Sequence, residues 1–521
     1  MKTKYIYMTL LGLLLIFNYS CEDRLDIPKH GNMGSQKDFY KTDADALQAI
    51  ASLYNTWGDG YYNWFYTKNL LADDIWCGGG SRGDNASMEQ LNEYTFDTDH
   101  AMITDLYSDM YKIIYKANLI IDLLEPDTDQ KKRAVAEARF FRAWANFELV
   151  TLFGTAPVVD HLLAPDEYRL GNSTPAEMWT FIEKDLSDAI NSGALPSKTN
   201  VNDPETGIRI TKEVAQAILG KAYLFQSKNT EAATILDQVI ESGKYNLYQG
   251  QYDMLLHAVA DGSSESMLEV QKRNDAEQIW NVGTMTFLMQ GWRSDKLNTT
   301  GEALNVIAQG TYGFMNPRKT LYNAFVAMEG KNGYRLNSTM RTYQQMMEFG
   351  ISIQPGASMI GHESLFMWKN RALQEDCVYD ASYFQSLQYI NLRVMRYAEV
   401  LLLAAEAHVQ AGSSEKALRY INQIRTRAQL TPLSSVTLKD IKEEKRLELC
   451  LESVRFQDLV RWGDAETAMG EQGKEILAFS ATGVEPLFTN TTYGFKAKHK
   501  LLPIPRKELD LNPNMQQNEN W

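Results

Sequence analysis

The chain has 521 residues, enough for one large folded unit or several smaller ones with substantial cores. Hydrophobic residues make up 44% of it and charged residues 23%, a globular composition that excludes disorder and fibrous repeats. The formal net charge of −14 produces a field that repels phosphate backbones, so nucleic acid is not an expected partner.

The first residues have the features of an export signal. Lys2 and Lys4 precede an apolar run from Met8 to Phe17, which is too short to cross a bilayer as a helix. We therefore expect residues 1–20 to be a signal peptide. No later stretch approaches the length of about 18 apolar residues that a membrane-spanning helix needs.

A cysteine directly follows this segment. Ser20 and Cys21, with two acidic residues after them, resemble the lipobox of bacterial lipoproteins, in which the cysteine thiol receives a diacylglyceryl group. The resemblance implies lipidation at Cys21, and the acyl chains would hold the protein on a membrane. The alternative is a secreted soluble protein. Residues 21–41 are polar and suit a tether and lead-in.

Apolar residues at helical spacing predict a mainly α-helical protein. They form four helix pairs, near residues 43–124, 131–191, 211–242 and 392–428. The segment Ala217–Tyr223 contains the L-G-x-x-Y pattern of a tetratricopeptide helix, and its small residues let paired helices approach closely. We therefore predict a tetratricopeptide-like solenoid whose stacked pairs bury a continuous apolar seam.

The segment from about residue 245 to residue 391 breaks this pattern. It is rich in Gly, Asn, Met, Tyr and Trp, which predicts an irregular inserted subdomain with a few short strands, resting on the solenoid. Loops that a rigid scaffold presents are common places for binding residues.

The sequence lacks the usual catalytic and cofactor motifs. Its seven histidines form no HExxH motif and its cysteines form no CxxC pair, so neither a metal ion nor another cofactor is expected. If Cys21 is acylated, the remaining cysteines, Cys77, Cys377 and Cys450, allow at most one disulfide.

The segment Gly78–Gly83 satisfies the GxGxxG pattern, yet it follows the acidic pair Asp73 and Asp74 and not a buried apolar strand. We therefore interpret it as a loop. Adjacent carboxylates diverge on a helix or a strand, so this pair cannot flank one glycosidic bond at the required separation of about 5 to 10 Å. An acid and a base from distant segments would still permit a glycoside hydrolase.

Aromatic residues surround this loop: Trp57, Tyr61, Tyr62, Trp64, Phe65, Tyr66, Trp76 and Tyr94. Flat rings pack on the apolar faces of a sugar, while Asp, Asn or Arg side chains hydrogen-bond its hydroxyls, so the mixture favours glycan binding. Our candidate glycan-binding residues are Asp74, Trp76 and Arg82 here, and Trp280 and Trp292 in the inserted region. The alternative is that most of these rings belong to the core.

Trp76 is the strongest single candidate, because the polar and glycine-rich residues beside it favour exposure of the ring. We expect the substitution Trp76→Ala to weaken glycan retention without altering the melting temperature.

The C-terminal third carries a more specific signal in the segments Arg396–Ala407, Ala417–Ala428, Glu444–Leu449, Arg455–Gly463, Leu502–Pro505 and Glu508–Asn514. With Cys21–Asp26 and Phe153–Val159 near the other end, these segments closely resemble the SusD-like (RagB/SusD) family of outer-membrane glycan-binding lipoproteins of Bacteroidetes. Within them, Arg455 and Asp458 stand at i and i+3 of one helix and are expected to pair.

The resemblance implies a single domain over residues 42–521 that holds glycans at the cell surface, anchored in the outer membrane by its lipid. It also implies a SusC-like TonB-dependent transporter as the partner, with no catalytic residues and no cofactor. A glycoside hydrolase, and a tetratricopeptide scaffold that binds only proteins or peptides, stay open as alternatives.

Overall fold

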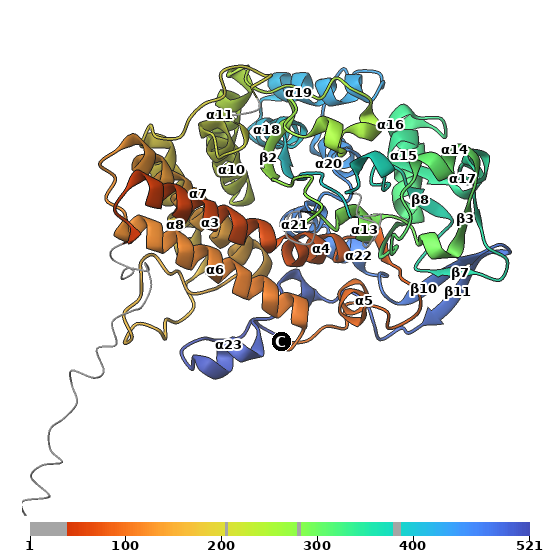
Figure 1. The fold of residues 1–521 in the computed structure, drawn as a ribbon, viewed down its shortest axis with the longest axis horizontal. Helices are drawn as coiled ribbons and strands as arrows, with labels where there is room; N and C mark the ends of the chain where they lie inside the picture. The colour runs from red at the N-terminus through yellow and green to blue at the C-terminus, as the bar shows by residue number, and fades with distance from the viewer. Residues whose placement is uncertain (1–38, 204–206, 279–282, 379–386) are drawn as a thin grey trace, which may run out of the picture.

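A computed structural model describes residues 39–203, 207–278, 283–378 and 387–521 (Figure 1). The predicted signal peptide, Cys21 and Trp280 lie outside the described residues. Within the described ranges, no helix combines the length and the apolar character needed to cross a membrane.

The chain is mainly helical up to residue 241 and again after residue 396. The first group comprises α3 (Asp43–Asp59), α4 (Tyr61–Leu70), β1 (Ile75–Cys77), α5 (Ala86–Glu93), α6 (Ala101–Leu123), α7 (Asp129–Phe153), α8 (Pro175–Asn191), α10 (Lys212–Phe225) and α11 (Asn229–Glu241). The second comprises α18 (Tyr397–Gln410), α19 (Ser414–Arg427), α20 (Leu438–Glu448), α21 (Arg455–Arg461), α22 (Ala465–Met469) and α23 (Arg506–Leu511).

Threonine side chains begin several of these helices. Thr42, Thr128, Thr174 and Thr211 lie at N-caps, where each hydroxyl accepts the backbone N–H of the third residue that follows. Gly154 caps the C-terminus of helix α7, and its φ of 75° is a conformation that glycine adopts without a Cβ clash.

Four helix pairs stack side by side, as the sequence predicts. Helix α3 packs on α6 and α7, α7 packs on α8, α10 packs on α8 and α11, and α18 packs on α11 and α19. In Figure 1 the stack runs from α3, α6, α7 and α8 on the left to α18 and α19 at the top. A Cβ on Gly220 of α10 would lie 2.5 Å from Leu236 Cγ on α11, so a small residue is required there. The predicted tetratricopeptide-like fold is confirmed.

The segment between α11 and α18 contains short strands and helices, also as predicted. These are β2 (Ser266–Val270), α13 (Thr286–Gln290), β3 (Leu297–Thr299), α14 (Gly301–Val306), β4 (Met315–Pro317), α15 (Lys319–Glu329), α16 (Tyr334–Thr339), β5 (Met340–Thr342), α17 (Tyr343–Phe349), β6 (Ile351–Ile353), β7 (Ser358–Ile360), β8 (Leu365–Met367) and β9 (Leu392–Arg396). The antiparallel pairs are β1 with β4, β2 with β9, β3 with β6, and β5 with β8.

A C-terminal hairpin, which the sequence analysis did not predict, joins this irregular region. Strands β10 (Glu475–Ser480) and β11 (Gly483–Thr489) pair antiparallel, and β10 also pairs with β7. Figure 1 shows the hairpin beside β7, at the end of the molecule opposite α8. Residues near the C-terminus therefore lie next to loops of the insert.

Candidate functional site

The side chain of Trp76 is packed inside the protein. Strand β1 places Trp76 opposite Asn316 of β4, and the residue is 6% exposed. Its indole Nε1 donates to Glu363 Oε2 at 2.7 Å, and the Arg318 guanidinium lies 3.7 Å from the ring centroid. The prediction of an exposed ring was wrong, because Arg318 and Glu363, from segments distant in sequence, pack against it.

Asp74 is buried too, at 1% exposed. Arg446 Nη2 donates to Asp74 Oδ1 at 2.6 Å, and Arg455 Nε donates to Asp73 Oδ1 at 2.8 Å. Burial raises the pKa of the Asp74 carboxyl, while Arg446 acts in the opposite direction. Because Arg446 and the core enclose Asp74, its carboxylate is not available to a ligand at the surface.

The predicted pairing of Arg455 with Asp458 was also wrong. Arg455 points toward Asp73 in the segment after α4. Asp458 instead binds Lys445 Nζ at 2.8 Å and Arg461 Nε at 2.8 Å. Burial opposes ionisation of Asp458, but the charges of Lys445 and Arg461 lower its pKa below the usual value.

Trp292 belongs to an aromatic cluster inside the insert and is 4% exposed. Its ring stacks against Trp368 at a centroid distance of 6.3 Å and meets Phe366 edge-on at 6.1 Å. The alternative reading of the rings as core therefore holds for Trp292, as it does for most rings of the first group, which are buried.

The loop that contains Arg82 and the segment that begins with Trp292 meet in space. Arg293 Nη1 donates to Asp84 Oδ2 at 3.2 Å, and Arg293 Nε lies 2.6 Å from Asp295 Oδ1. These contacts join loop 78–84 to segment 292–295. We call the exposed surface formed by Ser81, Arg82, Asp84, Arg293 and Asp295 the rim.

A glycine makes this junction possible. A Cβ on Gly78 would lie 2.2 Å from the Gly313 carbonyl oxygen and 2.4 Å from Asn316 Nδ2, so only glycine fits there. Gly78, the first glycine of the GxGxxG pattern, thus serves close backbone packing, whereas a Cβ on Gly83 would meet nothing within 4 Å. The strand before them, β1, is antiparallel to its neighbour, so the surroundings differ from those of a dinucleotide site.

Among the predicted residues that the structure describes, Arg82 is the one whose side chain reaches the surface, where it is 34% exposed. Its guanidinium donates to Glu93, pairs with Glu89 at 3.1 Å, and lies 5.0 Å from the Phe488 ring centroid. The pairs with Glu89 and Glu93 hold the side chain in one orientation. Phe488 is on β11, so the missed hairpin adds a ring beside the rim.

Hollows of sugar size open elsewhere on the described surface, and the sequence analysis did not find them. One of about 620 Å³ lies along α3 and includes Trp57, Asp59 and Lys272 in its lining. Two others, of about 670 Å³ and 560 Å³, share Tyr248. All three fall within the size range of about 300 to 1,000 Å³ that is typical of ligand sites.

Within the described ranges, no group of three His, Cys, Asp or Glu residues could hold a metal ion. Cys77, Cys377 and Cys450 are all free and buried. Burial raises the pKa of the Cys450 thiol to about 11 and that of the Cys377 thiol to about 12, so both are poor nucleophiles at neutral pH.

Comparison with protein-family models assigns both halves of the chain. Residues 243–521 match the model of the SusD family, and residues 33–224 match a model described as "Starch-binding associating with outer membrane". The chain belongs to the SusD family.

Relatives in this family cover nearly the whole chain. A laminarin-binding SusD-like protein of known structure is 28% identical, has a TM-score of 0.79, and covers 92% of this chain and 100% of its own. A SusD-like protein of Formosa agariphila is 26% identical over 97% of each chain. The starch-binding protein SusD of Bacteroides thetaiotaomicron is 24% identical over the full length of both chains.

Proposed function

We propose that this SusD-family member is a lipid-anchored protein of the cell surface that captures an oligosaccharide or polysaccharide and delivers it to a SusC-like TonB-dependent transporter. The observation that carries the proposal is the similarity, over 92% of the chain, to a protein that binds laminarin. The starch-binding relative supports the same class of ligand.

The rim is the proposed site of first contact, and Arg82 is its central residue. The rim offers guanidinium donors and carboxylate acceptors, and Phe488 provides an apolar ring next to Arg82. Hydroxyls of a sugar need such donors and acceptors, and its C–H face needs the ring. Because Glu89 and Glu93 already fix the guanidinium, binding would cost little side-chain entropy.

Affinity electrophoresis in gels that contain laminarin or starch tests this proposal. Wild-type protein should be retarded by at least one polysaccharide of a panel that begins with these two. Arg82→Gln should reduce the affinity about fivefold or more, because a charge-assisted hydrogen bond is lost. Lys439→Gln is the matched control, since it removes the same charge from a side chain that is 82% exposed on α20.

Two further measurements separate the alternatives. Release of oligosaccharide during incubation with a retained polysaccharide would favour a glycoside hydrolase over a binding protein. Retardation by no polysaccharide, together with a co-purifying protein other than a transporter, would favour a protein-binding scaffold.

The anchor and the partner need an experiment in cells. Cys21→Ala should release the protein from the membrane fraction, since no acyl chain can then form. Wild-type protein, isolated in mild detergent, should bring a TonB-dependent transporter with it. Isolation of the intact lipoprotein without a transporter would contradict the proposed delivery.

A further inference from the structure

A hollow of about 670 Å³ opens between segment 246–250, the start of α16 and one face of α19. Two tyrosines, Tyr248 and Tyr334, and two arginines, Arg419 and Arg427, line it together with several amide side chains. The lining contains no Asp or Glu. We call it the cationic hollow. It shares no residue with the rim.

Arg419 supplies the charge of the cationic hollow. It is exposed on α19, and in the part of the chain that the structure describes it forms no ion pair. Its guanidinium lies 5.5 Å from the ring centroid of Tyr420. In a protein whose net charge is −14, a polar hollow whose lining holds a guanidinium outside the ion pairs of the described residues, and no carboxylate, favours an anionic ligand.

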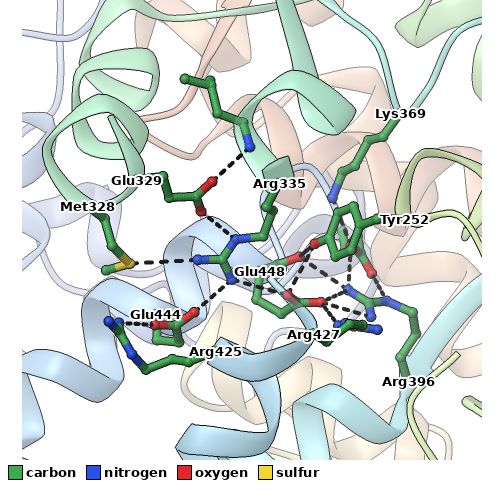
Figure 2. Close-up of polar contacts among 12 residues, drawn as sticks. Tyr252, Met328, Glu329, Arg335, Lys369, Arg396, Arg425, Arg427, Glu444 and Glu448 are labelled. Atoms are coloured by element: carbon green, nitrogen blue, oxygen red, sulfur yellow. Dashed lines mark hydrogen bonds and ion pairs between the residues drawn. The ribbon is translucent and has the colours of Figure 1, made fainter. Parts of the chain in front are cut away.

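Arg427 forms the floor, and its charge is already compensated. Its guanidinium binds Glu265 Oε2 at 2.5 Å and also binds Glu448, as Figure 2 shows for the latter pair. Its Nε is buried and has no hydrogen-bond partner among the described residues. Arg427 is therefore fixed in place and adds little net charge to the hollow.

A buried network of ion pairs holds this floor in place (Figure 2). Its cations are Arg335, Lys369, Arg396, Arg425 and Arg427, and its anions are Glu265, Glu329, Glu444, Glu448 and Glu452. Burial of Glu448 opposes its ionisation, but Arg427, Arg396 and Arg335 hold its pKa well below the usual range. Glu448 thus stays charged and keeps the arginines oriented.

The same network positions both tyrosines. Glu265, which binds Arg427, also accepts the backbone N–H of Tyr248 at 2.7 Å. Tyr334 Oη accepts the backbone N–H of Tyr252 at 3.2 Å, and Tyr252 Oη donates to Glu448 Oε2 at 3.1 Å. The rings and the floor of the hollow are therefore arranged before any ligand arrives, which lowers the cost of binding.

Tyr248 also separates the cationic hollow from the neighbouring one of about 560 Å³, which Tyr389 and Glu375 help to line. The Tyr248 ring folds back over Gly250, where a Cβ would lie 2.4 Å from Tyr248 Cζ. A chain of several sugar units would find a ring on the path between the two hollows.

We propose that the cationic hollow is a second saccharide site, which binds an acidic sugar. The carboxylate or sulfate of the sugar pairs with Arg419, its hydroxyls meet the amide side chains, and its apolar face lies against Tyr248 or Tyr334. This site goes beyond the proposed function, which concerns the rim. It adds a preference for acidic glycans, which the rim alone does not provide.

Isothermal titration calorimetry on the full-length protein tests this site with three probes. Oligogalacturonate carries carboxylates, a carrageenan oligosaccharide carries sulfates, and a laminarin oligosaccharide is neutral. At least one acidic probe should bind. Arg419→Gln should lower the affinity for that probe about tenfold, since a hydrogen bond between charged partners is lost. Added salt should weaken its binding more in the wild type than in Arg419→Gln. Which acidic probe binds identifies the anionic group.

Matched variants make the result decisive. Lys439→Gln should leave the affinity for the acidic probe unchanged, and Gly250→Ala, which displaces the Tyr248 ring without a change of charge, should weaken it. Any of three results would overturn the proposal. Neither acidic probe binds the wild type, or the Arg419→Gln variant binds the acidic probe as tightly as the wild type does. The third is that Arg419→Gln lowers the affinity for the neutral probe as much as it lowers the affinity for the acidic one. Retention by laminarin that depends on Arg82 but not on Arg419 would leave the proposed function intact.

Discussion

Arg318 and Trp76 form a stacked pair in which the guanidinium lies 3.7 Å from the ring centroid. Arg318 Nε also donates to the Ile75 carbonyl oxygen at 2.8 Å, next to the tryptophan on β1. Burial lowers the pKa of Arg318 to about 10, which leaves it charged at neutral pH. This pair ties loop 78–84, through β1, to the start of α15, and it sets the position from which the rim extends.

The substitution Trp76→Ala should therefore destabilise the protein. Loss of a buried tryptophan costs about 3 to 5 kcal/mol, and here it also leaves Glu363 and Arg318 without a partner ring. The midpoint of urea unfolding, followed by tryptophan fluorescence and circular dichroism, should fall. Trp76→Phe keeps a ring beneath Arg318 and should lower the midpoint of unfolding less than Trp76→Ala does. An unchanged midpoint with weaker glycan retention would restore the original reading of Trp76 as a surface platform.

The contrast between the helices and Trp76 shows what the sequence could predict. Helix pairs depend on local periodicity and on small residues such as Gly220, and both are visible within one stretch of chain. The burial of Trp76 depends on Arg318 and Glu363, which come from distant segments. Local composition favoured exposure, because the polar residues Ser81 and Arg82 follow Trp76 within one loop and do reach the surface.

The same limit applies to the rim and to the cationic hollow. The sequence named Arg82 and the neighbourhood of Trp292, but it could not place them together, because the ion pair between Arg293 and Asp84 closes a loop of more than 200 residues. Tyr248 belongs to no motif, and the segment Ala417–Ala428, which contains Arg419, indicated the family and not a ligand. Only the packing of α19 against the insert brings them to one hollow.

The partner of Arg455 can be tested by a double-mutant cycle. Arg455→Ala leaves Asp73 without its main partner, and the loss of one member of a buried pair costs about 3 kcal/mol or more. The coupling free energy between Arg455→Ala and Asp73→Asn should be about 1 to 3 kcal/mol, measured by urea unfolding. The cycle with Asp458→Asn provides the control and should give a value near zero. A larger coupling free energy with Asp458 than with Asp73 would show that Arg455 pairs with Asp458 within helix α21, as the sequence indicated.

The thiols should be unreactive in the folded protein. Cys77, Cys377 and Cys450 are buried, and burial raises the pKa of each thiol. A Cys21→Ser variant, treated with Ellman's reagent at pH 8, should show almost no reaction when native and three reactive thiols in guanidinium chloride. Only one thiol after unfolding would reveal a disulfide.

Acid should destabilise the protein through His362. The residue is fully buried beside Phe366, at a ring distance of 4.6 Å, and its Nδ1 accepts the Ser364 N–H at 3.0 Å. Burial lowers the pKa of His362 to about 3, whereas an unfolded histidine has a pKa of about 6.5. Between these values the unfolded chain binds a proton that the folded chain does not, so this contribution is complete above pH 6.5 and is lost as the pH falls toward 3.

The variant His362→Phe removes this titration and keeps an aromatic ring in the cluster. Below pH 6 the free energy of unfolding of the wild type should fall more steeply than that of the variant, by up to about 1.4 kcal/mol per pH unit. Urea unfolding at pH 7.5, 6 and 5 measures the difference in slope, so a constant cost of the substitution cancels. His499, whose pKa is also lowered to about 3, remains in the variant and preserves part of the slope. Parallel curves for the two proteins would mean that His362 is protonated in the folded state, with water or a neighbouring group near its Nε2.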